Sequence, residues 1–233
     1  MDISKLKIAR SLYYKCLGEL FTFSLSGQRL THLNEYLSAM KQGLFDESLA
    51  SCFDFLLENL EKTQSPKDFY EEYDKLFLTL KNAIPITFSY IEEGFENSKA
   101  LLNVKQILAK SSLRRNEKNF KESEDSVGFC FLLMSEFIKE ENNDLAKELF
   151  AKLINKNIDE FLKLIFENQN ANLYKQVALI AMAFMEFERF CFELEKPMTI
   201  SSKKVQNDLS RSEFLRRESN KQRRAREKSQ GIS

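Results

Sequence analysis

The apolar positions between residues 122 and 138 describe a helix that other parts of the protein surround. Apolar side chains recur there at helical spacing, and further ones cover most of the remaining circumference. A helix that is apolar nearly all round has to be enclosed by other elements. We therefore expect this stretch to be the central helix of the fold. Its apolar residues are Val127, Phe129, Cys130, Phe131, Leu132, Leu133, Met134, Phe137 and Ile138.

An acidic cluster, formed by Glu122, Glu124 and Asp125, stands directly in front of this apolar stretch. Carboxylates at a helix start lie at the positive end of the helix dipole and can accept hydrogen bonds from its free backbone amides. These acids are therefore placed where they can cap and orient the central helix.

The rest of the chain repeats apolar residues every three to four positions, which is the period of an α-helix. There is no strand-like alternation and no repeat of fixed length, and six glycines and three prolines leave few turns for hairpins. The sequence therefore predicts an all-α fold, a single bundle of about nine helices in one domain, residues 1–197. The helices besides the central one are expected at residues 3–24, 27–40, 46–62, 65–80, 98–109, 142–154, 158–168 and 173–194, the last of them ended by Pro197.

The helix expected last carries a seam of apolar residues at alternating steps of four and three. Such a seam can pair with a second copy as a coiled coil. It spans only three heptads and its apolar face is broad, so packing into the core is the favoured interpretation. The seam consists of Leu173, Val177, Ile180, Phe184, Phe187, Cys191 and Leu194.

Residues 81–94 form the one strongly irregular stretch, with Pro85 near its middle and apolar or aromatic residues on both sides. Loops usually expose their backbone and avoid such side chains. An apolar loop therefore indicates either a cover over the core or a recognition surface. A second loop, polar and basic, is expected at residues 110–121.

Charge divides the chain although its net charge is zero. Residues 201–233 hold ten Lys or Arg and four Asp or Glu, which leaves 25 of the 35 basic and 31 of the 35 acidic residues in the first 200. The body is therefore acidic, and residues 198–233 are expected to be a basic, flexible tail. The four scattered cysteines fit a reducing compartment, and no signal peptide or membrane span is recognisable. We expect a cytoplasmic protein with no membrane partner.

Catalytic signatures are missing from the sequence. The sole histidine, His32, lies in the polar part of an early helix pattern, and a structural or exposed role is favoured for it. No phosphate-binding loop, dinucleotide fingerprint, hydrolase elbow or zinc motif occurs, and the acidic cluster lacks the spacing of a calcium loop. We therefore expect a protein that is not an enzyme and that has neither a metal site nor a cofactor.

Three short motifs resemble those of one known family. Tyr73-Asp-Lys-Leu-Phe77, then Pro85, then Ser89-Tyr90 look like the block "Y-x-x-L-F … P … S-x-Y" of the TorD family, which are all-helical cytoplasmic chaperones of molybdenum-cofactor oxidoreductases. The stretch from Glu122 to Asp125 and the following serine sits where that family carries "E-P-x-D-H". Residues 10–21 are similar to the family's first helix, so the resemblance spans about residues 5–195.

Two positions depart from the signature. Ser123 replaces its proline and Ser126 replaces its histidine, while Glu122 and Asp125 keep its two acids. Losing the histidine puts in doubt any role for a titrating group there.

The resemblance implies a client-specific chaperone that binds the twin-arginine leader of a molybdoenzyme catalytic subunit, and the subunit body, until the cofactor is inserted before export. Carboxylates suit the leader arginines, and an apolar, Phe-lined groove suits the apolar stretch that follows them. Whether the two retained acids bind the leader or only cap the central helix stays open. The resemblance places the peptide site at Tyr73, Phe77, Pro85, Ser89, Tyr90, Glu122 and Asp125.

The family resemblance leaves the client and any ligand open. Formate dehydrogenase and respiratory reductases are all clients within the family, and some relatives are associated with weak guanine-nucleotide or molybdenum-cofactor binding. A monomer and a dimer are both compatible with such a bundle.

The tail contains a second resemblance. Ser210-Arg-Ser-Glu-Phe-Leu-Arg216 looks like the twin-arginine consensus S-R-R-x-F-L-K, without the apolar segment of an export signal. One hypothesis is that Ser210, Arg211, Phe214, Leu215 and Arg216 form a pseudo-ligand for the leader site; the other is a solvated tail with a chance match. An alternative function is a nucleic-acid- or protein-interaction module that uses this tail, with steep salt dependence. The acidic body argues against it, so a nucleic-acid partner is not expected.

Overall fold

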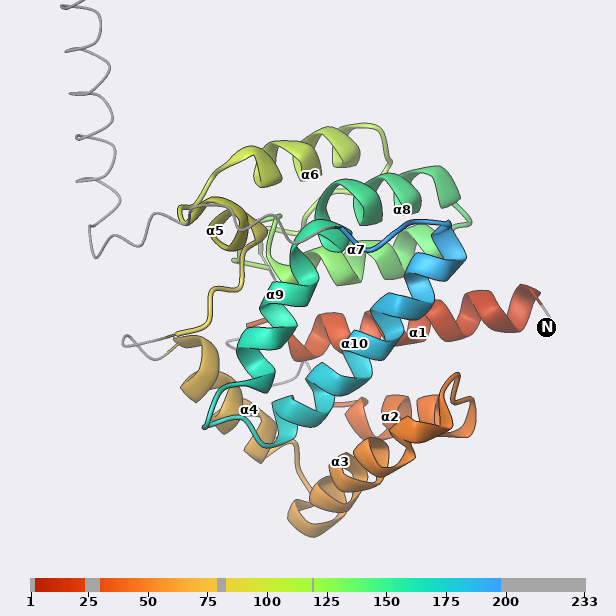
Figure 1. Cartoon of the computed structure of the whole chain (residues 1–233), viewed down its shortest axis with the longest axis vertical. Helices are drawn as coiled ribbons and strands as arrows, with labels where there is room; N and C mark the ends of the chain where they lie inside the picture. The colour runs from red at the N-terminus through yellow and green to blue at the C-terminus, as the bar shows by residue number, and fades with distance from the viewer. Residues whose placement is uncertain (1–2, 24–29, 79–82, 119, 198–233) are drawn as a thin grey trace, which may run out of the picture.

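The computed structural model describes residues 3–23, 30–78, 83–118 and 120–197, and apolar residues at three- and four-residue spacing form helices through 71% of them. Within these ranges there is no strand, as predicted, and only an isolated bridge between Thr87 and Ser126. The helices are α1 (Ile3–Leu20), α2 (Leu33–Gln42), α3 (Ala50–Thr63), α4 (Lys67–Tyr73), α5 (Phe88–Glu93), α6 (Lys99–Ala109), α7 (Val127–Lys139), α8 (Asn143–Leu149), α9 (Asn155–Phe166) and α10 (Leu173–Phe192) (Figure 1).

Helix α7 is the buried central helix that its apolar pattern predicts. Ten of its residues are buried, on every side of the helix. Its main partner is α1, and two glycines bring the two backbones close together. A Cβ atom on Gly128 would lie 2.7 Å from the carbonyl oxygen of Phe21, and one on Gly18 would lie 2.8 Å from Leu132 Cγ. Both positions therefore require glycine for this approach.

Helix α10 packs against α9, α3, α4 and α1, so its apolar seam lies in the core of the bundle (Figure 1). This confirms core packing as the use of the seam. The helix start is capped from far away in the sequence. The Glu72 carboxylate accepts hydrogen bonds from the backbone amides of Asn172, Leu173 and Tyr174 at 2.8 to 3.0 Å. These are amides that a helix start leaves without partners inside the helix.

Several boundaries differ from the predictions, among them the end of the first helix, which is Leu20 and not residue 24, and the start of the second, which is Leu33. Helix α10 ends at Phe192, five residues before Pro197, because Glu193 adopts a left-handed conformation with φ 54°. Helices α8 and α9 are not separate but continue through a π-helical turn, Phe150–Ile154. Residues 88–93 of the stretch expected to be irregular form helix α5. Counting joined segments once, the described residues hold nine continuous helices, as predicted.

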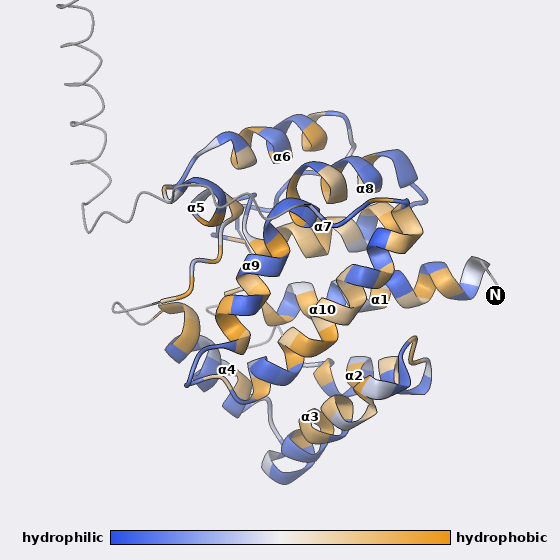
Figure 2. Ribbon diagram, viewed as in Figure 1, coloured by the Kyte–Doolittle hydropathy of each residue, from blue (hydrophilic) through white to orange (hydrophobic). Residues whose placement is uncertain are grey.

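Hydrophilic residues gather on the outer sides of α6 and α8 (Figure 2). The phenylalanines are largely core residues; Phe53, Phe69, Phe131 and Phe161 are among those fully buried. No helix in the described ranges is long and apolar enough to cross a membrane. The predicted helix start at Gly27 and the tail predictions, residues 198–233 with Ser210 to Arg216, lie outside the described residues.

Candidate functional site

The predicted recognition loop and the predicted acidic cluster meet in the structure. The Val127 amide donates to the Ile86 carbonyl oxygen at 2.8 Å, and the Phe88 amide donates to the Asp125 carbonyl oxygen at 2.9 Å. These two bonds flank the isolated bridge between residues 87 and 126. The start of α5 and the start of the central helix α7 are therefore fixed against each other.

Asp125 does not cap the central helix, which is one of the two roles that the sequence leaves open for it. Its side chain is buried, with 1% exposed, and its Oδ2 accepts a hydrogen bond from the backbone amide of Ser89 at 2.9 Å. It thus caps α5, whose own preceding residue, Thr87, makes no side-chain cap. The central helix is capped by Ser126, whose Oγ accepts from the Phe129 amide. The serine that replaces the family histidine is therefore the cap.

Ser89 continues this arrangement to the next helix. It is fully buried, and its Oγ accepts a hydrogen bond from the Ser98 amide at 3.2 Å. Ser98 in turn caps α6, accepting from the Ala100 amide. Asp125, Ser89 and Ser98 therefore link the starts of α5 and α6 in one chain of hydrogen bonds.

Glu122 joins three distant segments. Its Oε1 accepts hydrogen bonds from the Phe23 amide at 2.7 Å and from the Tyr73 hydroxyl at 3.3 Å. Tyr73 and Phe77 are themselves core residues, with ring centroids 4.8 Å apart, and both contact Tyr174 of α10. The Tyr73–Phe77 motif therefore builds the core under the site and presents no surface to a peptide.

Only part of the predicted site reaches the surface. Tyr90 is 48% exposed, and Pro85 and Glu122 are partly buried. Tyr73, Phe77, Ser89 and Asp125 are buried. The structure thus brings the seven predicted residues into one region but leaves three of them accessible.

A cluster of charges lies on this surface, and the site prediction included only one of its members, Glu122. Arg115 donates to the Glu122 carbonyl oxygen at 2.6 Å, and its Nε lies 3.7 Å from Glu124 Oε1. Lys105 of α6 lies 3.9 Å from Glu124 Oε2. We call Lys105, Arg115, Glu122 and Glu124 the Arg115 cluster. The sequence pattern signals its acids but not its cations, because Lys105 comes from the middle of α6 and Arg115 from the loop before α7.

Burial raises the pKa of the Cys130 thiol well above its ordinary value, and the negative charge of Asp125 raises it further. The neutral thiol donates to the Glu124 carbonyl oxygen at 3.4 Å. Cys130 therefore acts as a hydrogen-bond donor that holds the acidic segment in place. Within the described ranges, no group of His, Cys, Asp and Glu side chains has the arrangement of a metal site.

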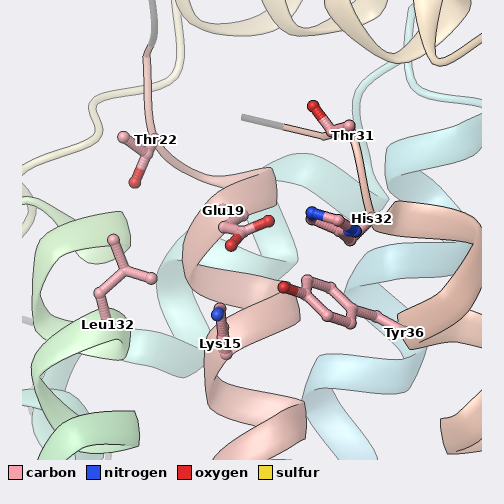
Figure 3. Close-up of a pocket in the computed structure, with 7 residues that line it drawn as sticks. All are labelled: Lys15, Glu19, Thr22, Thr31, His32, Tyr36 and Leu132. Atoms are coloured by element: carbon pink, nitrogen blue, oxygen red, sulfur yellow. The ribbon is translucent and has the colours of Figure 1, made fainter. Parts of the chain in front are cut away.

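Two adjoining hollows lie on another part of the surface, between α1, α2 and α7. The first, of about 560 Å³, is shown in Figure 3, with Lys15 and Glu19 of α1 between Tyr36 and Leu132. The second, of about 360 Å³, shares Lys15 and Tyr36 with it. Neither is lined by phenylalanine, so neither is the Phe-lined groove expected from the sequence. His32 borders the first hollow, is largely exposed and pairs with a glutamate three residues later, which fits the exposed role favoured for it.

Comparison with solved structures gives a match to a protein from Archaeoglobus fulgidus described as a redox enzyme maturation protein. The two chains are 19% identical with a TM-score of 0.51, and the match covers 77% of this chain and 93% of the other. At this identity the likeness concerns the fold. No curated protein sequence matches the chain.

Comparison with protein families gives a match to the nitrate reductase delta subunit family over residues 31–168. These residues make up more than half of the chain and include α5, α7 and the Arg115 cluster. The chain therefore belongs to the nitrate reductase delta subunit family, and it is a TorD-family chaperone of molybdoenzymes.

Proposed function

We propose that this chaperone binds the twin-arginine leader of a molybdoenzyme catalytic subunit and holds the subunit until its cofactor is inserted. The observation that carries the proposal is the Arg115 cluster, in which an acidic segment beside an exposed aromatic residue already holds a guanidinium group. Family membership supplies the class of client, and the cluster supplies a surface chemistry that suits its leader.

The surface offers both kinds of contact that a leader needs. Carboxylates bind guanidinium groups through charge-assisted and often bidentate hydrogen bonds. The half-exposed Tyr90 and the partly buried Ile86 and Pro85 can cover apolar residues that follow the arginines. Burying such apolar surface contributes about 25 cal/mol per Å² before the cost of ordering the peptide.

The buried members of the predicted site have a different part in this proposal. Asp125 and Ser89 hold the starts of α5 and α6, and Tyr73 and Phe77 support them from the core. They set the position of the binding surface without contacting the leader. This division separates residues whose loss disturbs the fold from residues whose loss weakens binding.

Calorimetric titration of the full chain with leader peptides from the molybdoenzymes of its own organism tests the proposal. Each leader is compared with a peptide in which Lys-Lys replaces Arg-Arg. We expect one leader to bind, and its control to bind at least about tenfold more weakly, because lysine lacks the planar fork of arginine. Formate dehydrogenase and the respiratory reductases are the proposed sources of clients.

A pair of aromatic substitutions locates the binding surface. Tyr90→Ala removes an exposed ring beside the acidic segment, while Phe190→Ala removes an even more exposed ring, 82% accessible, from α10. We expect only Tyr90→Ala to weaken leader binding. Equal effects of the two substitutions would place the leader elsewhere, and no binding of any leader by the unaltered protein would overturn the proposed function.

A further inference from the structure

We propose that Glu124 is the carboxylate that binds a leader arginine, and that Arg115 occupies this position until the leader displaces it. The inference rests on the proposed function and adds to it the binding residue and a built-in competitor. It assigns the role to an acid that the family signature does not mark, since the signature acids here are Glu122 and Asp125.

The three acids of the segment differ in the partners that they already have. Asp125 is buried and accepts a hydrogen bond from the Ser89 amide, and Glu122 accepts hydrogen bonds from the Phe23 amide and the Tyr73 hydroxyl. Among the described residues, Glu124 faces only cations, Arg115 at 3.7 Å and Lys105 at 3.9 Å, and its side chain is 18% exposed. Both distances exceed those of a hydrogen bond. Glu124 is thus the acid that gains most from an incoming guanidinium.

The hydrogen bonds of the Arg115 guanidinium group are incomplete. One of its nitrogens makes a short bond to the Glu122 carbonyl oxygen, and another lies 3.5 Å from Glu117, an exposed residue of the same loop. Its Nε is buried and has no hydrogen-bond partner among the described residues. A buried donor without a partner costs free energy. A guanidinium that pairs with Glu124 at bidentate distance therefore has an advantage over Arg115.

An exposed apolar side chain, Leu102, lies on the same helix face as Lys105 of the Arg115 cluster. Leu102 is 59% exposed and precedes Lys105 by three residues on α6, so the two side chains share one face of that helix. Lys105 contacts Glu124 directly. An arginine bound to Glu124 thus places neighbouring apolar residues of a leader near Leu102. This combination fits a peptide with arginine followed by apolar residues.

Leader titrations of three single variants test the inference, with Arg114→Gln as the matched control. Arg114 is the adjacent arginine, and within the described part of the chain its guanidinium donates only to the carbonyl oxygens of Leu108, Ser111 and Leu113. We expect Arg115→Gln to bind the leader roughly two- to fivefold more tightly, the size of one surface ion pair. Arg114→Gln should bind as the unaltered protein does, and Glu124→Gln about tenfold or more weakly.

Combined variants keep the test decisive. The double variant Arg115→Gln, Glu124→Gln should lose the gain of the first substitution, because the competitor and the leader share one carboxylate. Arg115→Lys retains a positive charge and should bind between the unaltered protein and Arg115→Gln. Thermal melting of each variant shows whether it is folded. If Arg115→Gln is not folded, the leader affinity of Arg115→Lys tests the competition in its place.

The outcomes separate the inference from the proposed function. Leader binding that Glu124→Gln leaves unchanged overturns the role of Glu124 while the proposed function stands. Binding that Arg115→Gln leaves unchanged or weakens overturns the competition. Absence of binding by the unaltered protein and by every variant overturns both. Tighter binding by Arg115→Gln, with Arg114→Gln unchanged, supports the inference.

Discussion

Two arginine–glutamate pairs in this molecule use the same chemistry in opposite surroundings. Arg10 of α1 meets Glu188 of α10 through two bonds of 2.6 and 2.8 Å, and its guanidinium lies 4.8 Å from the centre of the Phe192 ring. Arg115 lies 3.7 Å from Glu124 at a place where both side chains are partly exposed. The Arg10–Glu188 pair links α1 to α10, whereas in the Arg115–Glu124 pair either group can take another partner.

Burial is what separates the two pairs. The Glu188 side chain is fully buried, and this burial raises its pKa above the ordinary value although the contact with Arg10 acts in the opposite direction. A charge in such a place depends on its partner. The side chains of Arg115 and Glu124 keep 22% and 18% of their surface accessible, so water can replace either partner. A binding surface needs a pair such as Arg115 and Glu124, whose partners are partly exposed to water.

The largest effect is expected from Arg10→Met. It leaves the Glu188 carboxylate buried without its cation and should lower the free energy of unfolding by about 3–5 kcal/mol. Chemical denaturation measures the change. The double variant Arg10→Met, Glu188→Leu should recover most of the loss, since it removes the buried charge as well. A loss no larger than that of Lys7→Met, at an exposed pair one turn earlier on α1, would contradict this view.

The next effect concerns the acid that is buried within the acidic segment. Asp125→Ala removes the acceptor for the Ser89 amide and should lower the free energy of unfolding by about 1–2 kcal/mol. The Ser89 amide should also exchange its hydrogen faster with solvent. Glu124→Gln, only one position away, is the control and should leave both quantities nearly unchanged. Equal losses would remove the distinction between a structural and an exchangeable acid.

The sequence predicted the all-α class and the central helix because both follow from local periodicity. Nine apolar residues between Val127 and Ile138 leave little alternative to an enclosed helix. It also brought Pro85, Tyr90 and Glu122 into one site through the family motifs. What these motifs could not show is which of their residues reach the surface, because that depends on packing against segments far away in the chain.

Capping shows the limit of local patterns most clearly. Glu72 caps α10 from 100 residues away, and Asp125 caps α5 from 36 residues away. Glu72 lies within α4 and Asp125 lies just before α7, so the position of each acid in the sequence suggests a contact within its own segment. Only the folded arrangement shows that Ser126 caps the central helix and that Arg115 lies against the acidic segment.

A smaller effect depends on pH and concerns an acid held by two cations. Glu148 accepts hydrogen bonds from Lys110 and Lys152, and these bonds lower its pKa in the folded protein. A lowered pKa contributes stability that is present above the pKa of the unfolded chain and is lost as pH falls through the pKa of the folded protein. Glu148→Gln should therefore cost up to about 1 kcal/mol at pH 7 and nothing in strong acid. Denaturation curves across this range measure it, and a cost independent of pH would contradict the ionic origin.

The smallest effect on stability is expected from Arg115→Gln, below about 0.5 kcal/mol. The glutamine amide can still donate to the Glu122 carbonyl oxygen, so the substitution removes only the long and partly exposed contact with Glu124. Denaturation at low and high salt measures it, and the small difference from the unaltered protein should shrink further as salt screens the pair. Arg114→Gln, whose guanidinium bonds only carbonyl oxygens, is the control for general effects of losing a charge from this loop. A loss of several kcal/mol, comparable with that of Arg10→Met, would make Arg115 a structural residue like Arg10. An arginine that a leader can displace has to cost the fold little when it leaves.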